Sequence, residues 1–275
     1  MTEASPLRHI QKELRRSGLE KMGLKFEETD KVIAIAGNPN TGKSTLFNRL
    51  TGLNQHTGNW PGKTVTRAEG AYEFRGIRYK LVDLPGTYSL LSASQDEEIA
   101  RNFILFGQPD CTIVVTDATA LERNLNLVLQ VMEITDQAIV AVNMMDEARR
   151  KGIVIDTDTL SRDLGIPAVP ISARTGEGVH VLLSTIDDLI SGSIKTTPLR
   201  VKGTAELNHA ITELQKEIET LYPGIPNSRW LAIRLLDGDD RVQKAILSGE
   251  IRDLVHDQDR GSEDFSRKIA VEGRQ

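Results

Sequence analysis

The segment GNPNTGKS, residues 37–44, decides the fold of this chain. It follows the apolar run 31–36 and leads into the periodic segment 45–50, so a strand, a glycine-rich loop and a helix come in immediate succession. The pattern G-x-x-x-x-G-K-[ST] in this setting predicts a loop whose backbone N–H groups surround phosphate oxygens at a helix N-terminus. A chance glycine turn is the alternative, and the flanking strand and helix argue against it.

Apolar runs and periodic segments alternate from residue 31 to residue 190, which is typical of a parallel sheet wrapped by helices. The expected strands are 31–36, 68–74, 78–83, 111–116, 138–142 and 168–170, and the expected helices are 43–51, 94–106, 121–135, 157–164 and 179–190. The short gap between the second and third strands predicts an antiparallel hairpin. We therefore predict an α/β fold of the P-loop NTPase type, with a mostly parallel six-stranded sheet and helices on both faces.

Strand signals stop near residues 191–193, and the segment 195–201 is typical of a linker. Beyond it an apolar stripe at helical spacing consists of Leu207, Ile211, Leu214, Ile218 and Leu221. Further helices are expected at 229–236, 241–248 and 251–256. The predicted organisation is a leader (1–30), a nucleotide-binding domain (31–194) and a small all-α domain (195–275).

The composition excludes several classes of protein. The chain has 275 residues with a formal net charge of −5, which argues against a general polyanion binder. Its single cysteine, Cys111, lies in an apolar run and can form neither an internal disulfide nor a thiolate metal site. No window reaches the ~18 apolar residues of a membrane-spanning helix, and the first residues lack a secretory signal. We expect a soluble, cytosolic chain.

The first 25 residues carry six basic and three acidic side chains. Leu7, Ile10 and Leu14 define only a narrow apolar face. We interpret this segment as a solvated leader with partial helicity rather than as a membrane or partner docking helix.

An acidic residue ends one of the expected strands. Asp83 follows an apolar run and begins the sequence Asp-Leu-Pro-Gly, which closes with Gly86. In a nucleoside triphosphatase such an aspartate holds Mg²⁺ through a water molecule, together with the hydroxyl of the P-loop residue Ser44. The backbone N–H of Gly86 can then meet the γ-phosphate.

The residues that choose the base follow two later strands. An ionised Asp146 can accept two hydrogen bonds from the N1–H and the exocyclic amine of guanine, whereas adenine offers an acceptor at N1. Asn143 is expected to brace the loop and to reach the other edge of the base. The backbone N–H of Ala173 is expected to meet the guanine carbonyl oxygen. All four motifs, in this order and at these strand ends, predict GTP binding.

Together the motifs resemble the Ras-like G domains of translation-factor and Era-like GTPases. Finer details resemble the FeoB family of bacterial ferrous-iron transporters, in the runs 37–43, 58–65, 83–90, 117–125, 143–146 and 229–239. The sequences Asn-Trp-Pro-Gly and Asp-Leu-Pro-Gly-Thr-Tyr-Ser-Leu are the specific ones. The leader before Lys31 and the absence of a large membrane region depart from the family pattern. We therefore expect the cytosolic N-terminal portion of such a transporter, as a fragment or as a separate piece.

The resemblance implies a GTPase that couples its nucleotide state to ferrous iron uptake at the cytoplasmic face of the inner membrane. Where many small GTPases place a glutamine after the Asp-x-x-Gly motif, this chain has Thr87, so the catalysis needs another source. The resemblance implies a K⁺ ion held by the Asn40 side chain and by the backbone carbonyls of Gly58 and Trp60. It also implies that Thr64 binds Mg²⁺ in the GTP state.

The implied ligands are GTP or GDP, Mg²⁺ and K⁺. The residues expected to contact the nucleotide are Gly37, Asn38, Pro39, Asn40, Thr41, Gly42, Lys43, Ser44, Thr45, Gly62, Lys63, Thr64, Asp83, Gly86, Asn143, Met144, Asp146, Ser172, Ala173 and Arg174. Those expected to act in catalysis are Asn40, Lys43, Thr64 and Gly86. Ser44, Thr64 and Asp83 are the expected Mg²⁺ ligands. The expected partners are the membrane-embedded transporter region and small accessory proteins of the same system, without nucleic acid, and homo-oligomerisation stays open.

Several alternatives stay open at this point. Trp60 could anchor a partner or pack on its own domain, Asn40 could only stabilise its loop, and Thr66 competes with Thr64. The five histidines and the acidic cluster 237–240 are interpreted as surface groups and a helix start. An Era-like RNA-binding GTPase is the second functional hypothesis. It would need a basic RNA-binding surface after the nucleotide-binding domain, whereas residues 196–275 carry fourteen acidic and only twelve basic side chains. A nucleotide-binding scaffold with negligible turnover is the third.

Overall fold

The computed structural model describes residues 15–16, 18–27, 29–52, 55–91, 94–200, 203–223 and 225–247. The chain divides into two compact units. One spans residues 22–203, and the other contains the helices that follow residue 203. Among the described residues, no helix combines the length and the apolar character that crossing a bilayer requires.

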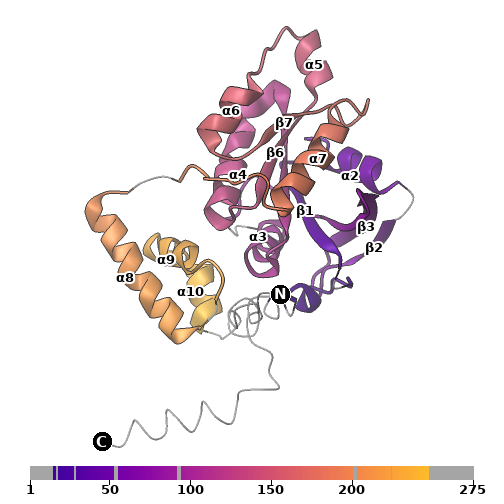
Figure 1. Ribbon diagram of the computed structural model, residues 1–275. Coiled ribbons are helices and arrows are strands. Elements are labelled where there is room, and N and C mark those ends of the chain that lie inside the picture. Colours follow the sequence, from indigo (N-terminus) through magenta and orange to yellow (C-terminus); the bar gives the residue numbers. More distant parts are fainter. Residues whose placement is uncertain are drawn as a thin grey trace, which may run out of the picture. The chain divides into compact units, whose positions relative to one another are not determined.

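The first unit is built on a seven-stranded sheet (Figure 1). Its strands are β1 (Lys31–Gly37), β2 (Gln55–Asn59), β3 (Thr66–Phe74), β4 (Ile77–Asp83), β5 (Cys111–Asp117), β6 (Ala138–Asn143) and β7 (Ala168–Pro170). Their order is β2-β3-β4-β1-β5-β6-β7, with parallel pairing from β4 through β7 and antiparallel pairing in β2–β3 and β3–β4. The predicted α/β fold and its hairpin are confirmed.

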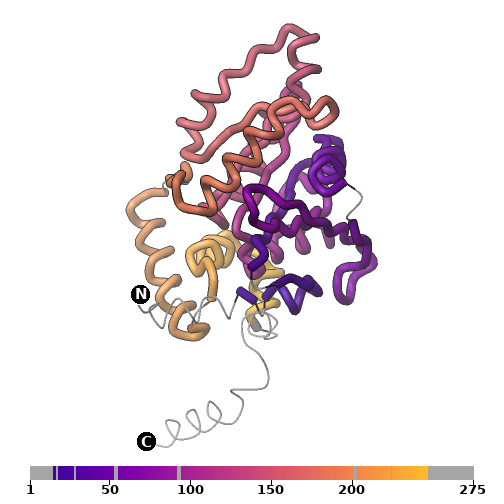
Figure 2. The backbone as a smooth tube through the Cα atoms, turned by 45° about the vertical axis from the view of Figure 1, so that its right-hand side comes forward, coloured from indigo at the N-terminus to yellow at the C-terminus, as the bar shows by residue number. Residues whose placement is uncertain are grey.

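The strand count is the point of difference, because the sequence predicts six strands and the sheet has seven. The additional strand, β2, is an edge strand of the sheet and lies at the right of Figure 2. Its sequence QHTGN has no apolar alternation, and it is a strand because its backbone pairs with β3 from Gln55 against Gly70 to Asn59 against Thr66.

The helices of this unit follow the strands in alternation. They are α2 (Lys43–Thr51), α3 (Gln95–Gly107), α4 (Leu121–Ile134), α5 (Met145–Arg150), α6 (Thr157–Leu164) and α7 (Val179–Ile190), with a short 3-10 turn, η1 (Ala118–Ala120), before α4. The predicted bounds of α2, α6 and α7 are confirmed. Ser94 proves to be the cap of α3, since its side chain accepts the Glu97 N–H. The short α5 was not predicted.

The central strands are buried on both faces. On one face Ile33 and Ile35 of β1 pack with Phe47 of α2 and Leu182 of α7. The alternate residues of β1 are equally buried on the opposite face, where α4 packs on β5 and β6. Because both faces are covered by helices, the loops at the carboxyl ends of the parallel strands are the open edge of the sheet.

Residues near both ends of the first unit are hydrogen-bonded to the rest of that unit. The Arg67 guanidinium donates to the carbonyl oxygens of Met22 (2.5 Å) and Gly23 (2.9 Å), and Arg78 pairs with Asp30 at 3.3 Å. Residues 22, 23 and 30 therefore differ from the predicted solvated leader, because two sheet arginines bind them. At the other end, the predicted linker also packs, as the N–H of Thr197 donates to the carbonyl oxygen of residue 165 at 2.9 Å.

The second unit is helical, as predicted. It contains α8 (Ala205–Leu221), α9 (Ser228–Leu236) and α10 (Asp240–Leu247). In the predicted apolar stripe, Ile211 and Ile218 are buried, whereas Leu207 and Leu221 are exposed. Within the acidic cluster, Asp239 accepts the N–H groups of residues 241 and 242 and so caps α10. The predicted helix 251–256 lies outside the described residues.

Candidate functional site

The glycine-rich loop joins β1 to α2 with a tightly constrained backbone. A Cβ on Gly37 would lie 2.5 Å from the Val115 carbonyl oxygen, and Gly42, the N-cap residue of α2, has a φ of 87°. The Thr41 hydroxyl donates to the Asn38 carbonyl at 2.9 Å and closes the loop. The first turn of α2 contains no acidic residue, so its N–H groups face no competing negative charge.

The functional groups predicted around the phosphates lie side by side. A Cβ on Gly86 would be 3.2 Å from the Lys43 ammonium and 3.4 Å from Pro39 Cα, so the Asp-x-x-Gly loop rests on the glycine-rich loop. Burial raises the pKa of Asp83 to about 6, although Lys43 and the Ser44 hydroxyl act to lower it. The structure thus brings Lys43, Ser44, Asp83 and Gly86 together.

These residues fit a divalent cation. The Oδ1 atom of Asp83 is buried without a hydrogen-bond partner, next to an exposed serine hydroxyl. A buried carboxylate oxygen without a partner is costly unless a cation or water meets it. Hard oxygen ligands of this kind suit Mg²⁺. Ser44 and Asp83 are therefore the residues that would hold it.

The base-recognition motifs are connected to the glycine-rich loop through Asn143. Its Nδ2 donates to the Thr41 carbonyl oxygen at 2.8 Å, and its Oδ1 accepts the Ala173 N–H at 2.8 Å. In this structure the Ala173 amide is bonded to the buried Asn143 side chain, and its expected contact with a guanine oxygen stays a prediction. Both polar atoms of the Asn143 side-chain amide therefore hold the glycine-rich loop and the loop of Ala173 together.

Asp146 is held at the start of α5, after Met144 in a left-handed conformation with φ 64°. Its Oδ1 accepts the Ser172 hydroxyl at 2.7 Å, and its Oδ2 pairs with the Arg174 guanidinium at 2.6 Å. These two hydrogen bonds, from Arg174 and then Ser172, lower the pKa of Asp146 to about 2. The carboxylate is therefore ionised at neutral pH, as guanine recognition requires.

One residue of this region was not singled out from the sequence. The Arg49 side chain on α2 donates to the carbonyl oxygens of Ala173 (2.5 Å) and Arg174 (2.6 Å). It fixes the last base-recognition loop to the helix that follows the glycine-rich loop. A basic residue in the last turn of a helix is common, so the sequence offered no signal for this contact.

The loop 60–65 lies against α3. The Trp60 ring is 4% exposed and meets Phe103 of α3 edge-on, with centroids 5.6 Å apart. Lys63 pairs with Glu98 of the same helix at 3.2 Å. Thr64 is exposed, as is Gly62, and the competing Thr66 begins β3 opposite Asn59. Of the two open readings of Trp60, packing on its own domain is the one that is seen.

The residues predicted to hold K⁺ have contacts of their own in this structure. Gly58 is paired with Arg67 in the β2–β3 ladder, and the Trp60 carbonyl oxygen accepts the Lys63 N–H at 3.0 Å. Asn40 is exposed in the glycine-rich loop, with φ 65°. The binding of K⁺ by these three residues stays a prediction.

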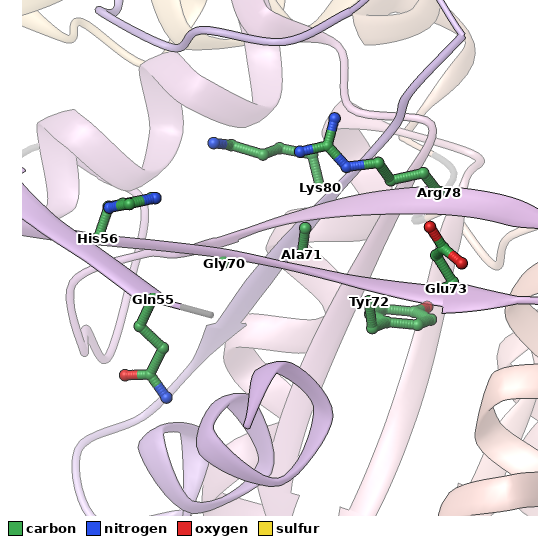
Figure 3. Close-up of a pocket in the computed structure, with 8 residues that line it drawn as sticks. All are labelled: Gln55, His56, Gly70, Ala71, Tyr72, Glu73, Arg78 and Lys80. Carbon is green, nitrogen blue, oxygen red and sulfur yellow. The ribbon is translucent and has the colours of Figure 1, made fainter. Parts of the chain in front are cut away.

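A cavity of about 610 Å³ lies away from these motifs, on β2, β3 and β4. Figure 3 shows Lys80 and Arg78 on one side of the strands, and Gln55 and Tyr72 on the other. None of the residues expected to contact nucleotide lines it. Across the described ranges, no group of three or more histidine, cysteine or acidic residues could hold a metal ion by itself.

Two family models match this chain. Residues 31–186 match the family described as ferrous iron transport protein B, and residues 204–269 match the FeoB cytosolic helical domain. The first match lies within the sheet-containing unit, and the second begins just before α8, the first helix of the second unit.

Known relatives agree with these matches. The chain is 42% identical over 217 residues to the Fe(2+) transporter FeoB of Escherichia coli K12, covering 75% of this chain and 27% of the relative. The chain thus spans about a quarter of the length of the curated relatives that it matches.

Solved structures show the same architecture. The cytosolic domain of L. pneumophila FeoB is 35% identical, with a TM-score of 0.71 over 83% of this chain and 90% of that one. The T. maritima cytosolic domain in its GDP form II is 33% identical, with a TM-score of 0.73 over 89% of this chain and 94% of that one. The GMPPNP form of the same domain is 34% identical, with a TM-score of 0.72 over 89% of this chain and 94% of that one. The chain belongs to the FeoB family of ferrous iron transport proteins and carries its G domain and cytosolic helical domain.

Proposed function

We propose that this chain binds GTP, hydrolyses it to GDP and phosphate, and acts as the nucleotide switch of a ferrous-iron transporter. The observation that carries the proposal is the joining of phosphate and base motifs by Asn143, whose side chain bonds to both Thr41 and Ala173. The T. maritima relative has been solved with GDP and with GMPPNP, and the curated relatives are Fe(2+) transporters. These support the proposal over the RNA-binding alternative.

On the phosphate side, the chain supplies positive charge and backbone donors. Lys43 places its ammonium beside Gly86, where the β- and γ-phosphates would lie. Ser44 and Asp83 would hold Mg²⁺, which would supply positive charge to offset the negative charge of the phosphates. The amide of Gly86 would orient the γ-phosphate. Thr87 is buried, and its hydroxyl donates to the Ser89 carbonyl oxygen at 2.6 Å, so it is directed to its own loop rather than to a water molecule.

On the base side, selectivity comes from the ionised Asp146. Guanine presents two donors on one edge and can replace the Arg174 guanidinium, whereas the N1 acceptor of adenine would face a negative charge. A base that cannot make this charge-assisted hydrogen bond should bind much more weakly, so the site should discriminate strongly between guanine and adenine.

Calorimetry tests the binding part. The purified chain should bind GDP and not ADP in the presence of Mg²⁺, and Asp146→Ala should lose GDP binding. Arg150→Ala, at an exposed arginine of the same helix, is the matched control and should leave binding unchanged. Equal binding of ADP with Asp146 intact would contradict the proposal.

Turnover is a separate step. Single-turnover measurements should show release of phosphate from bound GTP, and Lys43→Ala should abolish it. If GTP stays intact over hours, the chain is a nucleotide-binding scaffold.

We also propose that K⁺ stimulates hydrolysis, on the family resemblance and on the presence of Asn40, Gly58 and Trp60 at the positions that it implies. Rates measured in K⁺ and in Na⁺ at equal ionic strength test it. Equal rates would remove the cation from the mechanism.

The coupling to iron transport rests on the curated relatives, of which this chain covers 27%. The proposed partner is a membrane-embedded transporter region, with this chain at the cytoplasmic face of the membrane. A chromosomal Lys43→Ala change should lower cellular uptake of radioactive Fe²⁺. Unchanged uptake would contradict the switch role.

A further inference from the structure

The carboxylate that would recognise guanine is occupied by the chain's own side chains. Ser172 donates to its Oδ1 and Arg174 to its Oδ2, at 2.7 and 2.6 Å. The Asp146 side chain is 17% exposed, whereas that of Arg174 is 68% exposed. The recognition group is thus sheltered and its cationic partner is open to solvent.

Arg174 and guanine offer the same chemistry to this carboxylate. Guanine brings two N–H donors on one edge, and a guanidinium carries N–H donors in a fixed fork. Each carboxylate oxygen has two lone pairs, so the Ser172 hydroxyl can remain while another donor binds. Ser172 is buried and Arg174 is the exposed donor, so Arg174 occupies the solvent-facing side of the carboxylate from which a base would enter. The base and Arg174 therefore compete for Oδ2.

The backbone of the same loop is held independently. Arg49 binds the carbonyl oxygens of residues 173 and 174, and Asn143 binds the Ala173 N–H. Because these contacts fix the main chain, Arg174 can leave Asp146 by a side-chain rotation alone. Displacement then needs no rearrangement of the loop.

We propose that Arg174 is an internal competitor of guanine: it occupies Asp146 when no nucleotide is bound, lowers the affinity for guanine nucleotides and speeds GDP release by recapturing the carboxylate. The inference rests on the proposed guanine site. An exposed ion pair is weak, so the penalty on affinity is about two- to fivefold.

Arg174 could instead help binding by stacking its methylene stem on the base. Two substitutions separate these roles. Arg174→Met keeps an unbranched apolar stem and removes the donors, whereas Arg174→Ala removes both. Competition predicts tighter GDP binding in Arg174→Met, and stacking predicts no gain there and weaker binding in Arg174→Ala.

The experiment measures GDP affinity by calorimetry and release of a fluorescent GDP analogue by stopped flow. Arg174→Met should bind GDP about two- to fivefold more tightly, with slower release. Arg150→Met is the matched control, because it removes an exposed arginine that pairs with Glu147 instead of Asp146. It should match the wild type. The difference between wild type and Arg174→Met should shrink as KCl is raised, since salt screens an exposed pair.

Unchanged or weaker GDP binding in Arg174→Met, with the wild type binding GDP normally, would overturn the competition and leave the guanine site intact. If neither the wild type nor any variant binds GDP, the proposed function itself fails, and this inference falls with it.

Discussion

The loops expected to meet one nucleotide are held in two different ways. The glycine-rich, Asp-x-x-Gly and base-recognition loops contact one another at the carboxyl ends of parallel strands, through Asn143, Gly86 and Arg49. The loop 60–65 is held to α3 instead, by Trp60 and Lys63. The first group is preassembled for the phosphates and the base, whereas the loop with the expected switch threonine is held against α3.

The difference follows from where the loops are anchored. The preassembled loops leave strands that are buried on both faces, so their positions are set by the sheet. The loop 60–65 joins the exposed edge strand β2 to β3, and only a few side-chain contacts hold it. The loops expected to recognise the nucleotide are therefore fixed by the sheet, whereas a bound ligand can shift the loop 60–65 if it offers better contacts.

The largest expected effect tests the docking of the switch loop. Trp60→Ala should lower the free energy of unfolding by about 3 kcal/mol, because a buried indole is lost against Phe103. Urea denaturation measures it. Trp60→Phe keeps a ring against Phe103 and should recover more than half of the loss. A cost below about 1 kcal/mol in the alanine variant would show that the loop is not held by this ring.

The next effect tests the preassembled half. Lys43→Ala should weaken GTP binding about 10- to 100-fold, because a charge-assisted contact with the phosphates is lost. Calorimetry gives the dissociation constants. Lys151→Ala, at an exposed lysine after α5, should leave the affinity unchanged. Equal losses in both variants would point to net charge rather than to the glycine-rich loop.

A smaller effect concerns pH. The pKa of Asp83 is about 6 in the folded state, above its usual 3.8. Between pH 4 and 6 the folded state therefore binds a proton that the unfolded state has lost. Stability without ligand should therefore fall by about 1 to 2 kcal/mol as pH rises from 4 to 6, and stay level above. Urea unfolding at several pH values tests it, and Asp83→Asn should remove the slope.

Asp146 provides an opposite slope for comparison. Its pKa of about 2 is below the usual 3.8, so its contribution is present above pH 4 and is lost as pH falls toward 2. The two windows do not overlap. An unchanged slope between pH 4 and 6 in Asp83→Asn would assign it to other groups.

The smallest effect concerns the ion pair on α3. Lys63 and Glu98 are partly exposed, so their coupling should be about 0.2 to 1 kcal/mol. A double-mutant cycle with Lys63→Met and Glu98→Gln measures it by urea denaturation. A coupling above about 2 kcal/mol would mean that this pair, rather than Trp60, dominates the docking.

Local patterns predicted most of the sheet-containing unit. The bounds of α2, α6 and α7 and the β3–β4 hairpin were visible as periodicity and turn signals. The strand β2 was not, because its polar sequence becomes a strand only by pairing with β3. The short α5 was hidden because it begins inside the base-recognition motif and has no apolar stripe of its own.

The sequence by itself determined the P-loop fold, the order of the four nucleotide motifs and the family, because each depends on residues close together along the chain. Only the tertiary structure decided that Ala173 gives its amide to Asn143, that Arg174 occupies Asp146, and that Trp60 lies against α3. These contacts join loops and helices distant in the sequence. Their distances are set by how the strands pair and how the helices pack, which no local pattern encodes.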